Sequence, residues 1–214
     1  MTLERIPPTQ ARATAAATSV VLDVRGPAEF ARGHAAGAIA VPFSPRGLGA
    51  RALGVLPRGA SVILAAADYA VAEAAAAQLL EAGIAVRGVL AGGIDAWRDA
   101  GLPVATIGEV SIDDLSRRAA KATVIDVREP MEWATGHVPG ALLIPLGSLR
   151  DSLAGVPRSR EVIAICEAGV RSCTAASVLA AAGFTAVAHV PAGSSGYRRS
   201  GLPLAFPAGE EVAR

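Results

Sequence analysis

VLDVRGPAEF at residues 21–30 returns as VIDVREPMEW at residues 124–133, and the match continues along the chain. Gly33-His34, Gly37-Ala38 and Pro42 match Gly136-His137, Gly140-Ala141 and Pro145. At a slightly shorter spacing, Pro57, Gly83, Trp97 and 101–103 match Pro157, Gly183, Tyr197 and 201–203. Two copies in 214 residues make each copy the size of a small domain. We therefore expect two duplicated domains, residues 1–106 and 107–214, rather than a solenoid of short repeats.

Each copy alternates apolar runs with alanine-rich helical stretches. In the second copy the pattern predicts strands at 123–127, 141–144, 162–165 and 186–190, a helix from the Ser111 cap to Ala120, a short helix begun by Pro130, and a helix over 172–182 ended by Gly183. Apolar strands that alternate with helices are typical of an α/β fold, with a mostly parallel sheet flanked by helices in each domain. Ligands of such sheets bind beyond the carboxyl ends of the strands.

Cys166 lies at one of these carboxyl ends, and it opens the loop CEAGVRS at residues 166–172. The loop joins a buried strand to a helix, where unpaired backbone N–H groups and the positive end of the helix dipole favour thiolate over thiol. We interpret Cys166 as a nucleophile. The alternative is a thiol used for packing, because free cysteines are commonly buried.

Composition limits the other possibilities. With 20 basic and 19 acidic residues the chain is nearly neutral, so we expect neither a nucleic acid nor a membrane as partner. Residues 1–18 lack the apolar core of a secretory signal, and two neighbouring cysteines make no disulfide framework, so the cytoplasm is the expected location. Three scattered histidines give no metal-ligand spacing, and we expect no metal and no cofactor.

The repeated Asp-Val-Arg, Gly-His and Gly-Leu-Pro positions and the cysteine loop together resemble the rhodanese family over nearly the whole chain. The resemblance implies two tandem rhodanese-like domains and a sulfurtransferase. It implies that Cys166 takes a sulfane sulfur from a donor, thiosulfate or a persulfide, and passes it to a thiol or cyanide acceptor, with a protein as a further possible acceptor. By position, the substrate would lie in a cradle formed by Glu167, Ala168, Gly169, Val170 and Arg171.

The first copy departs from the family at the loop. Ala66 stands in place of Cys166, and Tyr69 and Val71 stand in place of Gly169 and Arg171; no cysteine precedes Cys166. We expect the first domain to carry no sulfur, and either to brace the second domain or to lend side chains to its entrance.

Two charged loop residues suggest opposite effects. Arg171 at the helix start can donate hydrogen bonds to an anionic sulfur, although it can equally be a surface arginine. Glu167 carries a negative charge beside the cysteine, which opposes a dianionic donor and disfavours thiosulfate.

Other candidates have structural interpretations. The residues present in both copies, Asp23, Arg25, His34, Asp126, Arg128 and His137, are expected to hold the loops together by hydrogen bonds. Cys173 is expected to pack inside the helix. His189 is expected near a strand end and partly exposed.

Two other functions use similar features. Phosphatases and arsenate reductases also have a loop cysteine followed by an arginine, but they commonly place five residues between the two, where this chain has four. The other alternative is a non-catalytic binding or regulatory module. An activated Cys166 distinguishes the enzyme from such a module.

Overall fold

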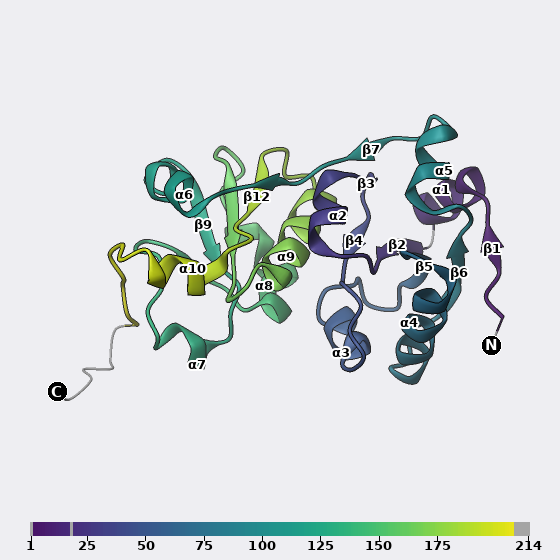
Figure 1. Cartoon of the computed structure of the whole chain (residues 1–214), viewed down its shortest axis with the longest axis horizontal. Helices are drawn as coiled ribbons and strands as arrows, with labels where there is room; N and C mark the ends of the chain where they lie inside the picture. Colours follow the sequence, from purple (N-terminus) through teal and green to yellow (C-terminus); the bar gives the residue numbers. More distant parts are fainter. Residues whose placement is uncertain (1, 18, 208–214) are drawn as a thin grey trace. The chain divides into compact units, whose positions relative to one another are not determined.

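The computed structural model describes residues 2–17 and 19–207. The chain forms two compact units, Met1–Ile107 and Gly108–Arg214. Each is built around its own parallel sheet, and helices cover both faces of that sheet (Figure 1).

The first unit contains a five-stranded parallel sheet in the order β1-β6-β5-β2-β4. Its strands are β1 (Arg5–Ile6), β2 (Ser19–Asp23), β4 (Ile39–Ala40), β5 (Ser61–Ala65) and β6 (Val86–Leu90), and β3 (His34–Ala35) pairs antiparallel with β7 (Val104–Ala105). Its helices are α1 (Pro8–Ala17), α2 (Pro27–Arg32), α3 (Leu48–Leu53), α4 (Tyr69–Glu81) and α5 (Gly93–Asp99).

The second unit repeats this topology. Its sheet has the order β10-β9-β11-β12-β8, again parallel throughout. The strands are β8 (Gly108–Glu109), β9 (Thr123–Asp126), β10 (Leu142–Leu143), β11 (Val162–Ile165) and β12 (Val187–His189). The helices are α6 (Ile112–Arg118), α7 (Pro130–Trp133), α8 (Leu149–Ser152), α9 (Val170–Ala181) and α10 (Gly193–Arg199), with the 3₁₀ turns η1 (Leu146–Ser148) and η2 (Leu153–Gly155) beside α8. Strand order therefore makes β8, β12 and β11 the counterparts of β1, β6 and β5.

Alternation along the strands builds the core of the second unit. Ile163 and Ile165 of β11 point to one face, where they join a buried cluster with Leu115 of α6 and Tyr197 of α10. Helix α9 packs on β11 and β12 with a face of buried residues from Ser172 to Leu179. The predicted α/β class with parallel, helix-covered sheets is confirmed.

The predicted elements of the second copy are present, while β8, α8, α10 and the turns η1 and η2 were not predicted. Helix α9 begins at Val170, two residues earlier than predicted, because Gly169 adopts a left-handed conformation that turns the chain directly into the helix. Arg171 and Ser172 therefore belong to the first helical turn. The two-residue strand β8 was not predicted, since so short an edge strand has no periodicity to detect.

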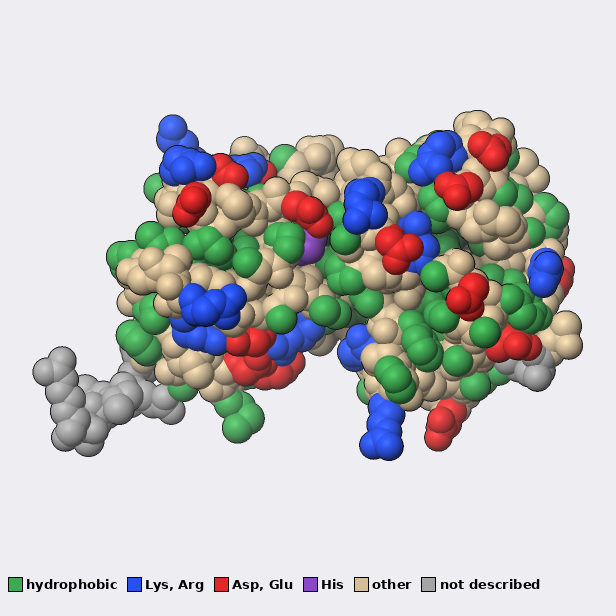
Figure 2. Space-filling view, viewed as in Figure 1, with side chains coloured by type: hydrophobic (Ala, Val, Ile, Leu, Met, Phe, Trp, Pro, Cys, Tyr) green, Lys and Arg blue, Asp and Glu red, His purple; other side chains and the backbone are tan. Residues whose placement is uncertain are grey.

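Basic and acidic side chains are interspersed over the visible face of each unit (Figure 2). In the part of the chain that the structure describes, no helix is both long enough and apolar enough to cross a bilayer.

Candidate active site

Cys166 follows the last residue of β11, a central strand, at the carboxyl edge of the sheet. Only 1% of its surface is exposed. Its Sγ lies 3.6 Å from the Oγ of Ser172 in the first turn of α9, and that Oγ donates a hydrogen bond to the Gly169 carbonyl at 3.0 Å. The thiol is thus enclosed at the N-terminal end of a twelve-residue helix, as the sequence predicts.

The loop after Cys166 has a fixed conformation. Gly169 has a φ of 85°, and a Cβ at this position would lie 2.4 Å from the Pro191 carbonyl oxygen. The backbone N–H of Ser194 donates to the Cys166 carbonyl at 2.7 Å, and that of Ser195 donates to the Glu167 carbonyl at 3.2 Å. Only glycine combines this backbone angle with so close an approach, so this conformation of the loop requires glycine at position 169.

The rest of the loop forms the surface above the thiol. Ala168 and Val170 are exposed, and Glu167 and Arg171 are partly exposed.

Arg171 is engaged by a carboxylate that the sequence analysis did not consider. Its two terminal nitrogens each lie 2.6 Å from an oxygen of Glu132 in α7. This bidentate pair lowers the pKa of the Glu132 carboxyl from 4.5 to about 2, chiefly through the hydrogen bonds from Arg171. The same pair raises the pKa of Arg171, to which the nearby Cys166 adds a smaller effect.

Glu167 is also paired. Its carboxylate accepts a hydrogen bond from Arg198 of α10 at 2.5 Å and lies 3.6 Å from Arg128. Two arginines therefore offset the negative charge that we expected to repel an anionic donor. Sequence spacing gave no sign of this pairing, because Arg198 is 31 residues away in the chain.

Arg128 and Asp126 form a fully buried ion pair, with both side chains 0% exposed. The guanidinium binds both oxygens of Asp126, and it also donates to the Gly136 carbonyl at 2.9 Å. In the first unit Arg25 binds Asp23 and the Gly33 carbonyl in the same way. The predicted hydrogen-bonding role of these residues is confirmed.

His34 and His137, which occupy equivalent positions in the two units, are both buried. The His34 Nδ1 lies 2.9 Å from the Phe30 carbonyl, and the His137 Nδ1 lies 3.1 Å from the Val138 carbonyl. Burial lowers the pKa of His34, whose ring also stacks on Phe30. Both contacts agree with the structural role predicted for them. Cys173 is 0% exposed within α9, as expected for a packing residue.

His189 lies at a strand end as predicted, but the predicted partial exposure was wrong, because only 1% of its surface is exposed. The residue ends β12 between two neighbouring strands, and its Nδ1 lies 3.3 Å from the Ser172 Oγ. Its Nε2 faces Glu109 of β8 at 3.8 Å. Burial lowers the pKa of His189, while Glu109 and the Gly169 backbone act in the opposite direction.

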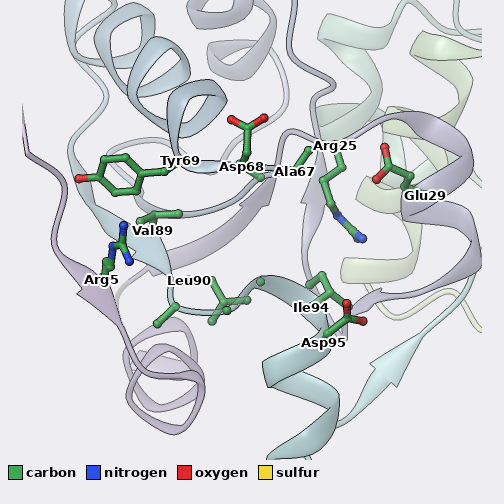
Figure 3. Close-up of a pocket in the computed structure, with 14 residues that line it drawn as sticks. Arg5, Arg25, Glu29, Ala67, Asp68, Tyr69, Val89, Leu90, Ile94 and Asp95 are labelled. Carbon is green, nitrogen blue, oxygen red and sulfur yellow. The ribbon is translucent and has the colours of Figure 1, made fainter.

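The first unit has a cavity of about 380 Å³ at the position that corresponds to the cysteine loop (Figure 3). Ala66 and Ala67 line it, together with Arg25, Glu29 and Tyr69. The counterparts of the last three are Arg128, Glu132 and Gly169. No cysteine is among the residues that line this cavity.

Tyr69 changes the start of the helix in the first unit. It is the first residue of α4, Asp68 caps that helix, and the Tyr69 hydroxyl accepts from the Leu3 N–H at 2.7 Å and donates to the Leu3 carbonyl at 3.1 Å. The ring also lies 4.8 Å below the Arg5 guanidinium. In the first unit, Tyr69 at the position of Gly169 therefore binds the N-terminal segment of that unit, at Leu3 and Arg5.

No group of three or more His, Cys, Asp or Glu side chains that could hold a metal ion occurs among residues 2–17 and 19–207.

The fold and the site together describe a duplicated α/β protein with one enclosed cysteine at a strand-to-helix turn. The family model for the rhodanese-like domain matches residues 8–100 and 111–200. The chain belongs to the rhodanese family, with two rhodanese-like domains in tandem.

Curated relatives agree with this assignment. The chain is 31% identical over 106 residues to a sulfurtransferase of Allochromatium vinosum, and the matched region covers 48% of this chain and 99% of the relative. It is 32% identical over 79 residues to the thiosulfate sulfurtransferase GlpE of Pseudomonas entomophila, and the matched region covers 37% of this chain and 72% of the relative. It is 36% identical over 90 residues to the probable adenylyltransferase/sulfurtransferase MoeZ of Mycobacterium tuberculosis, covering 41% of this chain but only 23% of that protein.

Among solved structures, thiosulfate sulfurtransferase from Pseudomonas aeruginosa matches 95% of this chain and 44% of its own, with 22% identity and a TM-score of 0.42.

Proposed function

We propose that this protein is a sulfurtransferase whose second domain, residues 107–214, carries a sulfane sulfur on Cys166. The observation that supports this most directly is the position of Cys166, enclosed at the start of α9 under a loop of Glu167, Ala168, Gly169, Val170 and Arg171. Helix N-termini favour thiolates. The sulfurtransferase relatives support the same class of reaction.

With thiosulfate as donor, the Cys166 thiolate attacks the outer sulfur, the S–S bond breaks, and sulfite leaves with the electron pair. A thiol or cyanide then attacks the terminal sulfur of the Cys166 persulfide. This second step returns the thiolate and releases a persulfide or thiocyanate. A persulfide donor follows the same course, with its thiolate as the leaving group, and a protein thiol can serve as the acceptor.

The first domain carries no sulfur in this proposal, because Ala66 stands at the position of Cys166 and no cysteine precedes it. The loop of the second domain supplies the substrate contacts. Arg171 is held by Glu132, so we assign to it the orientation of the loop as well as a positive charge near the sulfur.

Sulfur transfer by two single-cysteine variants tests the proposal. Thiocyanate formation from thiosulfate and cyanide, and sulfide release from a persulfide in the presence of a dithiol, are measured for both. Cys166→Ala should be inactive with every donor, while Cys173→Ser should keep most of its activity. Turnover by Cys166→Ala would contradict the mechanism, and inactivity of the wild-type protein with all donors would favour the non-catalytic module.

A further inference from the structure

Four side chains form a continuous line at the carboxyl edge of the second sheet. Cys166 Sγ lies 3.6 Å from Ser172 Oγ, and Ser172 Oγ lies 3.3 Å from His189 Nδ1. His189 Nε2 lies 3.8 Å from Glu109 Oε1. The line runs from a buried thiol to a carboxylate that is 49% exposed.

His189 occupies a costly position. Its imidazole is buried, and its Nε2 has no hydrogen-bond partner in the described part of the chain. A buried polar group without a partner destabilises the fold by roughly 1–3 kcal/mol. Packing alone would be served better by an apolar residue, and the first unit has one at this position.

The first unit shows which residues stand at the same four positions in a domain without the thiol. In the sheets, Glu109 pairs with His189, and Arg5 pairs with Val89 in the same register of the first unit. The counterparts of the four residues, Cys166, Ser172, His189 and Glu109, are Ala66, Ala72, Val89 and Arg5. All four polar members are thus absent from the unit that lacks the thiol. The buried Asp-Arg pair and the Gly-His positions, by contrast, occur in both units and serve the fold.

We infer that Ser172, His189 and Glu109 form a proton relay that deprotonates Cys166. The Ser172 hydroxyl, which donates to the Gly169 carbonyl at rest, first turns toward His189 Nδ1 at 3.3 Å. The Cys166 S–H proton then passes to the Ser172 oxygen while the Ser172 proton passes to His189 Nδ1. One S–H and one O–H bond break, one O–H and one N–H bond form, and no electrons are transferred. The products are a thiolate and an imidazolium that faces the Glu109 carboxylate. The use of the thiolate as a sulfur carrier rests on the proposed function. The proton transfer that forms the thiolate does not, and it can be tested without a sulfur donor.

The surroundings of His189 suit this role. From β8 it faces Glu109, from α9 it faces the Ser172 hydroxyl, from the loop it faces the Gly169 carbonyl, and its paired residue on β11 is the uncharged Ala164. Burial lowers the pKa of His189 and keeps the ring neutral, which a proton acceptor must be. Glu109 then stabilises the positive charge that the transfer creates. His189 and Glu109 are positioning residues, since neither touches the reacting sulfur.

The test is the rate at which iodoacetamide, an uncharged reagent, alkylates Cys166, read by peptide mapping so that Cys173 is scored separately. His189→Asn keeps a hydrogen-bond acceptor of similar shape but cannot take up a proton. Its rate should fall about tenfold at pH 7 and stay within about twofold of wild type at pH 10, where hydroxide replaces the relay. A wild-type rate at pH 7, or an equal loss at both pH values, would overturn the inference, because a purely structural role would not depend on pH.

Glu109→Gln keeps the test decisive if His189→Asn folds poorly, and a double variant adds a second criterion if it folds. Glu109→Gln, half-exposed on an edge strand, should lower the pH 7 rate a few-fold. The control Glu161→Gln should not, because this carboxylate lies before the first residue of β11, at the other end of the sheet, where it pairs with Arg118. Equal rates for Glu109→Gln and wild type would overturn the inference. The double variant Ser172→Ala/His189→Asn should lose no more than the worse single variant, because both changes interrupt one path; fully additive losses would count against a relay.

The relay and the proposed function fail separately. If alkylation follows this pattern but no donor places sulfur on Cys166, the relay stands and the sulfurtransferase proposal fails. If sulfur is transferred and alkylation ignores His189, the reverse holds.

Discussion

Arg171 and Glu132, which lie 39 residues apart in the sequence, form a two-point ion pair in which both nitrogen–oxygen distances are 2.6 Å. The pair ties α7 to the first turn of α9, directly beside Cys166. The guanidinium that sequence reasoning assigned to the sulfur is therefore held in place by a carboxylate.

This pair should contribute to stability over a defined pH range. The pKa of Glu132 is lowered from 4.5 to about 2, so its contribution is present above pH 4.5 and is lost as the pH falls toward 2. Glu132→Gln should destabilise the second unit by about 1 kcal/mol at pH 7, since the pair is partly exposed. The difference between the variant and the wild type should vanish near pH 2. Urea unfolding can measure it through Trp133, the only tryptophan of the second unit, in a Trp97→Phe background. A difference independent of pH would contradict the assignment.

The position of Glu167 between two arginines predicts the effect of removing its charge. Glu167→Gln leaves Arg198 and Arg128 without this partner, so the potential near Cys166 becomes more positive. The rate with thiosulfate should rise several-fold and fall more steeply with salt, because a charge change at partial exposure is worth about 1 kcal/mol. A persulfide donor, which carries less negative charge at its sulfur end than the thiosulfate dianion, should gain less. Equal gains with both donors would show that the effect is not electrostatic, and a similar gain in Glu161→Gln would show that it does not come from the charge at position 167.

The buried pair of the second unit should matter more than its counterpart in the first. Arg128 is 0% exposed and Arg25 is 13% exposed, and each binds an aspartate that is fully buried. Arg128→Met leaves Asp126 as an uncompensated buried charge, and we expect a loss of about 3–5 kcal/mol in the second unit. Arg25→Met should cost less, because water can reach Asp23 more easily. As a control, Arg117→Met removes an exposed pair and should change stability by less than about 1 kcal/mol. Losses of equal size at Arg128 and Arg117 would contradict this account.

The sequence was sufficient for the fold because its signals are local and occur twice. The apolar run at 162–165 is the strand β11, Ser111 caps α6 by accepting a hydrogen bond from Asp114, and Pro130 begins α7. Each of these depends on neighbouring residues. The duplication then gave the number of domains without any knowledge of their packing.

The surroundings of Cys166 could not be predicted in the same way, because they depend on contacts between distant segments. Glu132, Arg198 and Glu109 reach the site from a short helix, a late helix and an edge strand, and no spacing links them to the cysteine. The burial of His189 was missed for the same reason, because it follows from the strands that pair on either side of β12. Comparison of the two copies could have provided a clue, since Ser172 and His189 are replaced by Ala72 and Val89 in the copy without a thiol.

The first unit should not become active when it receives a cysteine alone. In Ala66→Cys/Cys166→Ala the new thiol would follow β5 at the equivalent position, but Tyr69, Ala72 and Val89 supply neither the glycine turn nor the relay. We expect its rate of sulfur transfer to remain at the level of Cys166→Ala. Activity near that of the wild type would show that position alone activates the cysteine, and that the surrounding residues of the second unit are dispensable.

The most direct measurement is the intact mass of the protein after incubation with thiosulfate or with a small-molecule persulfide, followed by peptide mapping under non-reducing conditions. We predict the gain of one sulfur atom, located on Cys166, present in Cys173→Ser, absent in Cys166→Ala, and lost when a thiol acceptor is added. A protein that gains no sulfur from either donor, or gains it on Cys173 alone, would contradict the proposal that Cys166 is the sulfur carrier.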